Sequence, residues 1–256
     1  MTNFVTTVRE KTEKGVVCRV SIDNQTKLNT LNSAIIKELT ECFVSLKQDK
    51  EVAVVILTGA GEKSFIGGAN INEMVALNVD TARTFITNLH LLCVAIRDTP
   101  FPVIARVNGY CLGAGMEIAA ICDIIVAIQS AQFSMPEVRV GIPSVIEAAV
   151  LPKILGIGLT RDLLLTGRTM YSDEAHRVGF IQRLAKDGEL DAIVDTVVAD
   201  ILDSGRIAIK LQKELCNAWE NVSVAHGVQL GIDAFAKAFE TDEPTKMLGD
   251  FVNRKR

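Results

Sequence analysis

Apolar and polar positions alternate near the start of the chain and give way to continuous apolar runs further on. Alternation over residues 4–22 predicts two short strands broken at Lys14-Gly15. Later runs have the length of a strand and are largely apolar, as expected for strands buried on both faces. These runs occupy residues 53–57, 102–107 and 123–128.

Helical spacing of apolar residues separates these strands. Apolar positions recur every three or four residues from Ser33 to about Lys47 and over roughly 80–97, and a short helix is expected through Met74. Two of the buried runs end in glycine-rich loops, 59–70 and 108–115. Strands that alternate with helices predict an α/β fold, in which loops after strands commonly hold the functional site.

Beyond Pro143 the pattern is mostly helical, and the best remaining strand signal is 179–181. Two amphipathic stripes, 190–201 and 224–239, need a partner surface. We therefore divide the chain into a catalytic core, 1–190, and a helical region, 191–256, that serves partly as an oligomer interface. The expected helices are 145–155, 159–166, 172–178, 189–203, 206–219 and 224–240.

Composition narrows the class of protein. The 256 residues are 48% hydrophobic and 23% charged with a net charge of −4, which gives no reason to expect nucleic acid or an anionic membrane as a partner. No apolar run approaches the ~18 residues that a membrane span needs. Six scattered cysteines and an N-terminus without a signal-peptide pattern favour a reducing compartment, and we expect the cytoplasm.

Several familiar chemistries lack their motifs. The segment Gly59-Ala60-Gly61-Glu62-Lys63-Ser64 has Glu62 where a phosphate-binding loop needs glycine, and Gly113-Ala114-Gly115 lacks the third glycine of a dinucleotide fingerprint. The three histidines have no metal-binding spacing, so no metal is expected and each histidine reads as a surface or capping residue. A G-x-S-x-G elbow is also missing.

Residues 108–143 contain the strongest candidate chemistry. Glu117 stands in an apolar helical run just after glycines, and Glu137 follows twenty residues later in a polar break. Two carboxylates in different environments are typical of acid–base catalysis. If Ala69 and Ala114 each begin a helix after a tight turn, their free amides can converge on one oxygen and form an oxyanion hole.

Each of these features also has a simpler interpretation. Glu117 suits the first turn of a helix, where the helix dipole favours a carboxylate. Glu137 is unremarkable in a loop after proline, and the glycines can serve only to turn the chain. The combination of both glutamates with both loops is what favours proton transfer.

The same stretches resemble the crotonase superfamily, the enoyl-CoA hydratase/isomerase family. Residues 65–74 are similar to its F-x-A-G-A-D-I-x-E-M, residues 107–123 to its V-N-G-x-x-x-G-G-G-x-E-L-x-x-x-C-D, and residues 131–137 to A-x-F-x-x-P-E. Residues 165–167, 239–243 and 251–256 also match. The matches follow the family's order over nearly the whole chain.

The resemblance implies a spiral of ββα repeats with a C-terminal helical trimerisation region, usually in a hexamer of two trimers. It implies an acyl-CoA substrate whose thioester oxygen binds the amides of Ala69 and Ala114. Glu117 matches the glutamate that activates water for attack at Cβ. Glu137 matches the one that protonates Cα and polarises the same water. Coenzyme A belongs to the substrate, so no separate cofactor is implied.

Further positions match the family's coenzyme A contacts. Lys63 corresponds to a position near the nucleotide, and Phe251 and Arg254 correspond to positions that reach coenzyme A from a neighbouring subunit. Gly67 and Gly68 belong to the same expected substrate site. Each of these residues can also be an ordinary surface or packing residue.

One turn departs from the family pattern. After Glu137 the family often reads G-x-I-P-G-x-G-G-T, whereas this chain has Gly141-Ile142-Pro143-Ser144-Val145-Ile146-Glu147-Ala148. The Ser144 amide then only approximately replaces a water-binding glycine amide. Glu147 either begins the next helix or lines the acyl pocket. The expected activity is enoyl-CoA hydration; the alternatives are isomerisation, another lyase reaction on a branched or aromatic acyl-CoA, and acyl-CoA binding without turnover.

Overall fold

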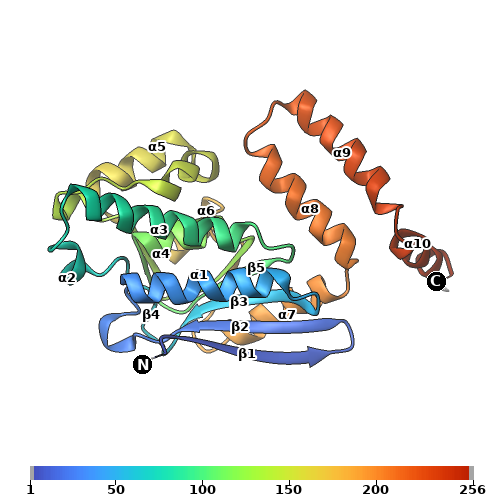
Figure 1. Cartoon of the computed structure of the whole chain (residues 1–256), viewed down its shortest axis with the longest axis horizontal. Helices are drawn as coiled ribbons and strands as arrows, with labels where there is room; N and C mark the ends of the chain where they lie inside the picture. The colour runs from blue at the N-terminus through green and yellow to red at the C-terminus, as the bar shows by residue number, and fades with distance from the viewer. Residues whose placement is uncertain (1–2, 254–256) are drawn as a thin grey trace.

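The larger of two sheets forms the centre of the molecule in this computed structural model, which describes residues 3–253. Strand β1 is antiparallel to β2, and the other neighbours are parallel. Figure 1 shows this sheet behind the helices that cover it. Its spatial order is β1 (Val5–Thr12), β2 (Gly15–Ile22), β3 (Val52–Gly59), β5 (Val103–Val107), β7 (Ile124–Ile128) and β10 (Arg183–Ala185).

Strands β3, β5 and β7 are each followed, after a short loop, by a strand of a second, smaller sheet. Its strands are parallel apart from the last pair. A strand of the large sheet, a strand of the small sheet and a helix thus follow one another repeatedly, and the expected spiral of ββα repeats is confirmed. The small sheet has the order β4 (Ser64–Ile66), β6 (Tyr110–Leu112), β8 (Gln132–Ser134) and β9 (Thr169–Tyr171).

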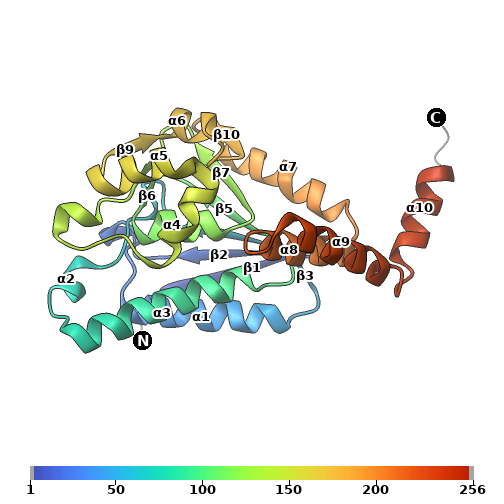
Figure 2. The same ribbon diagram turned by 90° about the horizontal axis from the view of Figure 1, so that it is seen from above.

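Helices cover both faces of the large sheet, as the largely apolar strands predict. In β3, Val55 and Leu57 belong to the main core beneath α1 and α3, whereas Val54 and Ile56 pack in a second core with α7. Successive side chains of a strand point to opposite faces, so one strand supplies both cores. Figure 2 shows α7 on the opposite side of the sheet from α1 and α3. These helices are α1 (Ser33–Gln48), α3 (Val79–Arg97) and α7 (Leu190–Leu202).

The remaining helices are short connectors or belong to the C-terminal part of the chain. None of the helices within residues 3–253 is both long and apolar enough to cross a membrane. The helices are η1 (Gln25–Lys27), α2 (Ile71–Met74), α4 (Ala114–Ile121), η2 (Glu137–Val140), η3 (Ile146–Val150), α5 (Leu151–Thr166), α6 (Ser172–Arg177), α8 (Arg206–Trp219), α9 (Val224–Ala238) and α10 (Glu243–Asn253).

The prediction of a strand at 179–181 is wrong. Gly179 has a φ of 84°, and the strand β10 begins only at Arg183. Phe180 is fully buried, with its ring centroid 5.4 Å from that of Phe133. The apolar signal in this segment therefore reflects burial of a loop against the core and not a sheet position.

Helices α8, α9 and α10 extend away from the sheets (Figures 1 and 2). Helix α9 leaves a row of exposed apolar side chains on one face, at intervals of three or four residues. This row is uncovered in the single chain, as the amphipathic stripe predicted. Its members are Val224, Val228, Ile232, Phe235 and, just after the helix, Phe239.

A buried lysine fastens α8 to the core. The Lys213 ammonium donates hydrogen bonds to Thr99 Oγ1 at 2.9 Å, to the Phe101 carbonyl at 3.0 Å and to Asp123 Oδ2 at 2.7 Å. Its side chain is only 6% exposed. All three protons of the ammonium are thus used, which compensates for taking the charge out of water.

We predict that Lys213→Ala lowers the free energy of unfolding by about 2–4 kcal/mol, because it leaves buried acceptors without a donor. Urea unfolding measures this change. Lys210→Ala is the matched control on the same helix: its ammonium is 48% exposed and 3.9 Å from Glu214, so its loss should cost less than about 0.5 kcal/mol. Equal losses in the two variants would contradict a role for Lys213 in holding α8.

Candidate active site

The first glycine loop follows the short strand β4. Its backbone pairs with the segment before α1: the Leu31 amide donates to the Gly68 carbonyl at 2.9 Å, and the Asn70 amide donates to the Leu31 carbonyl at 2.8 Å. The Asn70 side chain caps α2, which begins at Ile71. The expectation that Ala69 itself begins a helix is therefore wrong by two residues. Its amide is nevertheless free, with no acceptor among residues 3–253.

The second loop turns sharply at Gly113. This residue has φ 51° and ψ −120°, a conformation that a side chain would make costly, and its amide donates to the Ser134 carbonyl at 2.8 Å. Helix α4 begins at Ala114, as expected, so the Ala114 amide has no acceptor within the described chain. The two loops are adjacent: Gly68 Cα lies 4.0 Å from where a Cβ on Gly113 would stand.

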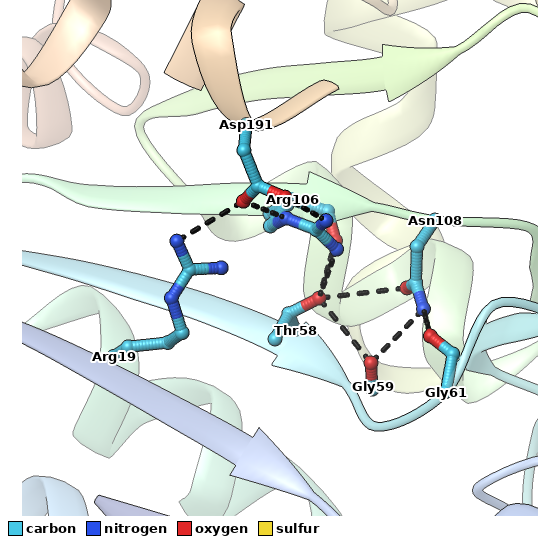
Figure 3. Close-up of polar contacts among 7 residues, drawn as sticks. All are labelled: Arg19, Thr58, Gly59, Gly61, Arg106, Asn108 and Asp191. Atoms are coloured by element: carbon cyan, nitrogen blue, oxygen red, sulfur yellow. Dashed lines mark hydrogen bonds and ion pairs between the residues drawn. The ribbon is translucent and has the colours of Figure 1, made fainter. Parts of the chain in front are cut away.

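Asn108 helps to hold the loops together. Its Nδ2 donates to the carbonyls of Gly59 at 2.9 Å and Gly61 at 2.6 Å, which joins the ends of β3 and β5 (Figure 3). The side chain is 4% exposed, so these bonds are shielded from water. Sequence reasoning placed Asn108 only at the edge of the candidate stretch. Its contacts are with residues 47 and 49 positions earlier, which no local pattern reveals.

Figure 3 also shows how α7 is fixed near these strand ends. Asp191 accepts hydrogen bonds from Arg106 Nε at 2.9 Å and Nη2 at 2.7 Å, and from Arg19 Nη2 at 3.1 Å. The Arg106 hydrogen bond keeps the pKa of Asp191 below its usual value, against the opposing effect of burial. The arginines link α7 to β2 and β5, and this cluster supports the strands that lead into the site.

Glu117 is buried in the first turn of α4, with 4% of its surface exposed. Its Oε1 accepts a hydrogen bond from the Ala148 amide at 2.9 Å. Burial raises the pKa of Glu117 to about 8, because the charged form loses water; the Ala148 bond opposes this rise, and the charges of Glu137 and Glu147 add to it. A carboxyl with this pKa exchanges protons near neutral pH.

Glu137 opens η2, and its carboxylate lies beside the second loop. The Ser144 hydroxyl donates to its Oε2 at 2.7 Å. A Cβ on Gly113 would lie 2.3 Å from Glu137 Oε1, so glycine at 113 is what permits this carboxylate to approach the loop. The altered turn of residues 141–148 thus supplies a hydroxyl to Glu137 and a backbone amide to Glu117.

A cavity of about 990 Å³ brings these parts together. Its wall includes both carboxylates and both loops, and the rest is mainly apolar. Ligand sites typically combine an apolar wall with a few convergent polar groups. The polar end is formed by Gly67, Gly68, Ala69, Gly113, Glu117 and Glu137, and the apolar wall includes Met74, Leu77, Phe85, Ile86, Leu89 and Val145.

The other predicted site residues lie away from this wall. Lys63 is exposed between β3 and β4, and Phe251 is 73% exposed on α10. Arg254 lies outside the described residues. Ser144 reaches the cavity only through Glu137, and Glu147 is buried behind it, beside His90. Their roles stay predictions.

His90 is exposed, as interpreted from sequence, and its Nδ1 also lies 2.6 Å from Glu147 Oε1. The partners are 57 residues apart, so no spacing in the sequence could suggest the contact. Among residues 3–253, no cluster of histidine, cysteine, aspartate and glutamate side chains is arranged to hold a metal ion.

Known proteins share this fold and sequence. Residues 12–256 match the family model described as Enoyl-CoA hydratase/isomerase. The chain is 33% identical to the short-chain-enoyl-CoA hydratase of Clostridium acetobutylicum, covering 95% of this chain and 94% of that protein. It is 32% identical to the crotonyl-CoA hydratase of Syntrophomonas wolfei, covering 97% and 95%. The crystal structure of an enoyl-CoA hydratase from Bacillus anthracis superposes with a TM-score of 0.93 at 26% identity, covering 98% and 97%.

We predict that Glu117→Gln stabilises the protein increasingly as the pH rises. The pKa of Glu117 is about 8 when folded and returns towards the ordinary 4.5 on unfolding. Between these values the folded state keeps a proton that the unfolded chain releases, so this group lowers the free energy of unfolding as the pH increases. Urea unfolding at about pH 5 and about pH 8.5 measures the difference.

The control is Glu13→Gln, in the exposed turn between β1 and β2. Its effect should be small at both pH values. A Glu117→Gln variant whose gain in stability is the same at both pH values would show that the Glu117 pKa is not raised.

Proposed function

The chain belongs to the enoyl-CoA hydratase/isomerase family, and we propose that within it the protein is an enoyl-CoA hydratase. It would add water across the double bond of a 2-enoyl-CoA to give a 3-hydroxyacyl-CoA. The observation that carries this proposal is the pair of carboxylates, Glu117 and Glu137, on one cavity wall beside two glycine loops. The names of the relatives from Clostridium acetobutylicum and Syntrophomonas wolfei support the same reaction.

The two free amides provide the electrostatic part of the mechanism. Attack of water at Cβ moves negative charge through Cα to the thioester oxygen, which becomes an enolate oxygen. The amides of Ala69 and Ala114 would donate to this oxygen, and the N-terminus of α4 adds its dipole. Preorganised donors of this kind each contribute roughly 3–4 kcal/mol to a transition state.

The glutamates provide the proton transfers. Ionised Glu117 would take a proton from water as the water oxygen bonds to Cβ, and Glu137 would deliver a proton to Cα and polarise the same water. The raised pKa of Glu117, about 8, makes it a stronger base than an ordinary carboxylate. The proton gained by Glu117 then returns to Glu137 or solvent, which restores the site. The Ser144 hydroxyl orients Glu137 for this exchange.

The substrate would bind with its acyl chain along the apolar wall that α3 supplies through Phe85, Ile86 and Leu89. Gly67 and Gly68 would line the path of the thioester, and Lys63 would approach the nucleotide of coenzyme A. Phe251 projects on α10 with its ring exposed, which suits a contact with coenzyme A bound to a neighbouring subunit.

Self-association into a trimer or a hexamer completes the proposal. The exposed apolar row of α9 supports it, because a helix that is apolar on one face needs a covering surface. In this view residues 1–190 form the catalytic core and 191–256 form the oligomerisation region, although α7 packs on the core sheet. The described cysteines are all free, which supports a reducing compartment such as the cytoplasm.

The second candidate is an isomerase or another lyase acting on a branched or aromatic acyl-CoA. The altered turn at 141–148 favours it, because Ser144 binds Glu137 through a hydroxyl where the family pattern has glycines. An acyl-CoA-binding protein without turnover is disfavoured, since such a protein has no need to keep the costly burial of Glu117.

Hydration of crotonyl-CoA tests the proposal directly, through loss of the absorbance of the conjugated thioester. Glu117→Gln and Glu137→Gln should each lower kcat by at least about 100-fold and leave binding of the acyl-CoA nearly unchanged, because both retain shape and lose proton transfer. Tight acyl-CoA binding by the wild-type protein without hydration would rule out a hydratase. A near-normal rate in either variant would remove that glutamate from the mechanism.

We further predict that Gly113→Ala lowers kcat by at least about 10-fold, because its Cβ would collide with Glu137 Oε1 and displace the carboxylate. Gly156→Ala is the matched control. Gly156 also has a positive φ, 75°, in a conformation unfavourable to alanine, but a Cβ there meets no described atom within 4 Å. Both variants should lose stability, and only Gly113→Ala should lose turnover. Equal losses of turnover would indicate backbone strain alone.

A further inference from the structure

A third carboxylate lies behind the two that line the cavity. Glu147 belongs to the first turn of η3, its side chain is buried, and the next residue, Ala148, donates the amide that holds Glu117. The resemblance to known relatives gives no role to a glutamate here, since the family pattern has glycines in this turn. Glu147 directly precedes Ala148 in the chain. The peptide group between these two residues supplies the N–H that donates to Glu117.

The surroundings of Glu147 leave its charge only partly compensated. Its Oε1 is 2.6 Å from His90 Nδ1, whereas its buried Oε2 has no hydrogen-bond partner within the described chain. Cys93, one helical turn after His90, faces the same carboxylate, whose charge adds to burial in raising the pKa of the thiol. A buried carboxylate with one partner is expensive, and an apolar residue would cost less. Such a cost suggests a function for the charge.

We propose that Glu147 and His90 form a positioning pair that controls the ionisation and orientation of Glu117. This inference rests on the proposed function, because it gives the proposed base of the hydratase its charge state. Neither residue lines the cavity within the described chain, so the pair acts through Glu117 and not on substrate.

The pair would act on Glu117 in two ways. The contact with His90 anchors η3 to α3 and fixes the Ala148 amide on Glu117 Oε1. The negative charge of Glu147 also repels that of Glu117 and contributes to its raised pKa. The His90 side chain is 48% exposed, so its ring is also in contact with solvent. A positive charge on the His90 ring would offset the charge of Glu147 and so make ionisation of Glu117 easier.

The ionisable groups packed around Glu117 are few. Helix α3 contributes Cys93, and His90 on the far side of Glu147; η3 contributes Glu147, and η2 contributes Glu137. Two arginines, Arg83 of α3 and Arg139 of η2, line the same cavity as Glu117, and Arg139 Nε donates to the Thr166 carbonyl. Strand β6 contributes the buried Cys111, whose thiol has a pKa raised by burial, and β4 has no ionisable residue. Lys153 on α5 donates its hydrogen bonds away from Glu117, to the Glu220 carbonyl and to Asn221 Oδ1. His90 is thus the group whose proton opposes the charge of Glu147.

Infrared difference spectroscopy of the full-length protein without ligand tests this inference independently of turnover. The Glu117 carboxyl band is identified as the signal lost in Glu117→Gln. Its titration midpoint should fall by roughly half a unit or more in Glu147→Gln, which removes the repelling charge. It should rise in His90→Asn, which keeps a hydrogen-bond donor but cannot carry a positive charge. Glu214→Gln, at an exposed position of α8, should leave it unchanged.

The acid limb of kcat/KM for crotonyl-CoA hydration should move in the same directions as these midpoints. If the wild-type protein does not hydrate crotonyl-CoA, the proposed function is wrong. The infrared titration still tests whether His90 and Glu147 control the ionisation of Glu117. Midpoints equal to that of the wild-type protein in both variants would overturn this inference, even if stability falls, because a purely structural role changes stability alone. If Glu147→Gln does not fold, His90→Asn provides the same test from the solvent side.

Discussion

The cost of burying the Glu117 carboxylate shapes the whole site. An ionised carboxylate in an apolar helix needs compensation. Within residues 3–253, the one hydrogen bond that Glu117 receives comes from the Ala148 amide, 31 residues further along the chain. The turn at 141–148 must therefore pack against α4. The contact between His90 of α3 and Glu147 keeps the turn in this position. The incomplete compensation leaves Glu117 with a pKa of about 8, which suits the role of a base that we propose for it.

The strand topology explains how distant segments reach this carboxylate. Parallel strands β3, β5 and β7 end on the same edge of the sheet, and each passes into a short strand of the second sheet. Their loops therefore meet at one place, where Asn108 joins the ends of β3 and β5. Glycine at 113 then lets the Glu137 carboxylate approach the second loop. The fold thus brings both glycine loops and two carboxylates to one wall.

Local patterns predicted most of the buried elements. The all-apolar run 53–57 and the helical spacing from Ser33 correctly indicated β3 and α1, because burial on two faces or on one stripe leaves a periodic signal. The strands of the small sheet have only three residues each, too few for any period, and were missed. Phe180 and Ile181 carried an apolar signal in a loop, which produced a false strand.

The site shows the same division between local and long-range information. Glu117 and its glycines were found because a lone charge in an apolar helix is a local anomaly. The partnership of His90 with Glu147, and that of Ser144 with Glu137, depend on tertiary packing. The start of α2 at Ile71 depends on the Asn70 cap, so Ala69 presents its amide from an extended segment and not from a helix.

The central claim is that the amides of Ala69 and Ala114 bind one thioester oxygen within reach of both glutamates. A crystal structure of the protein with a bound 3-hydroxyacyl-CoA measures this most directly. The account predicts that the thioester oxygen lies about 3 Å from both amide nitrogens and that the 3-hydroxyl contacts Glu117 and Glu137. A thioester oxygen bound away from either amide, or a 3-hydroxyl far from both carboxylates, would contradict it.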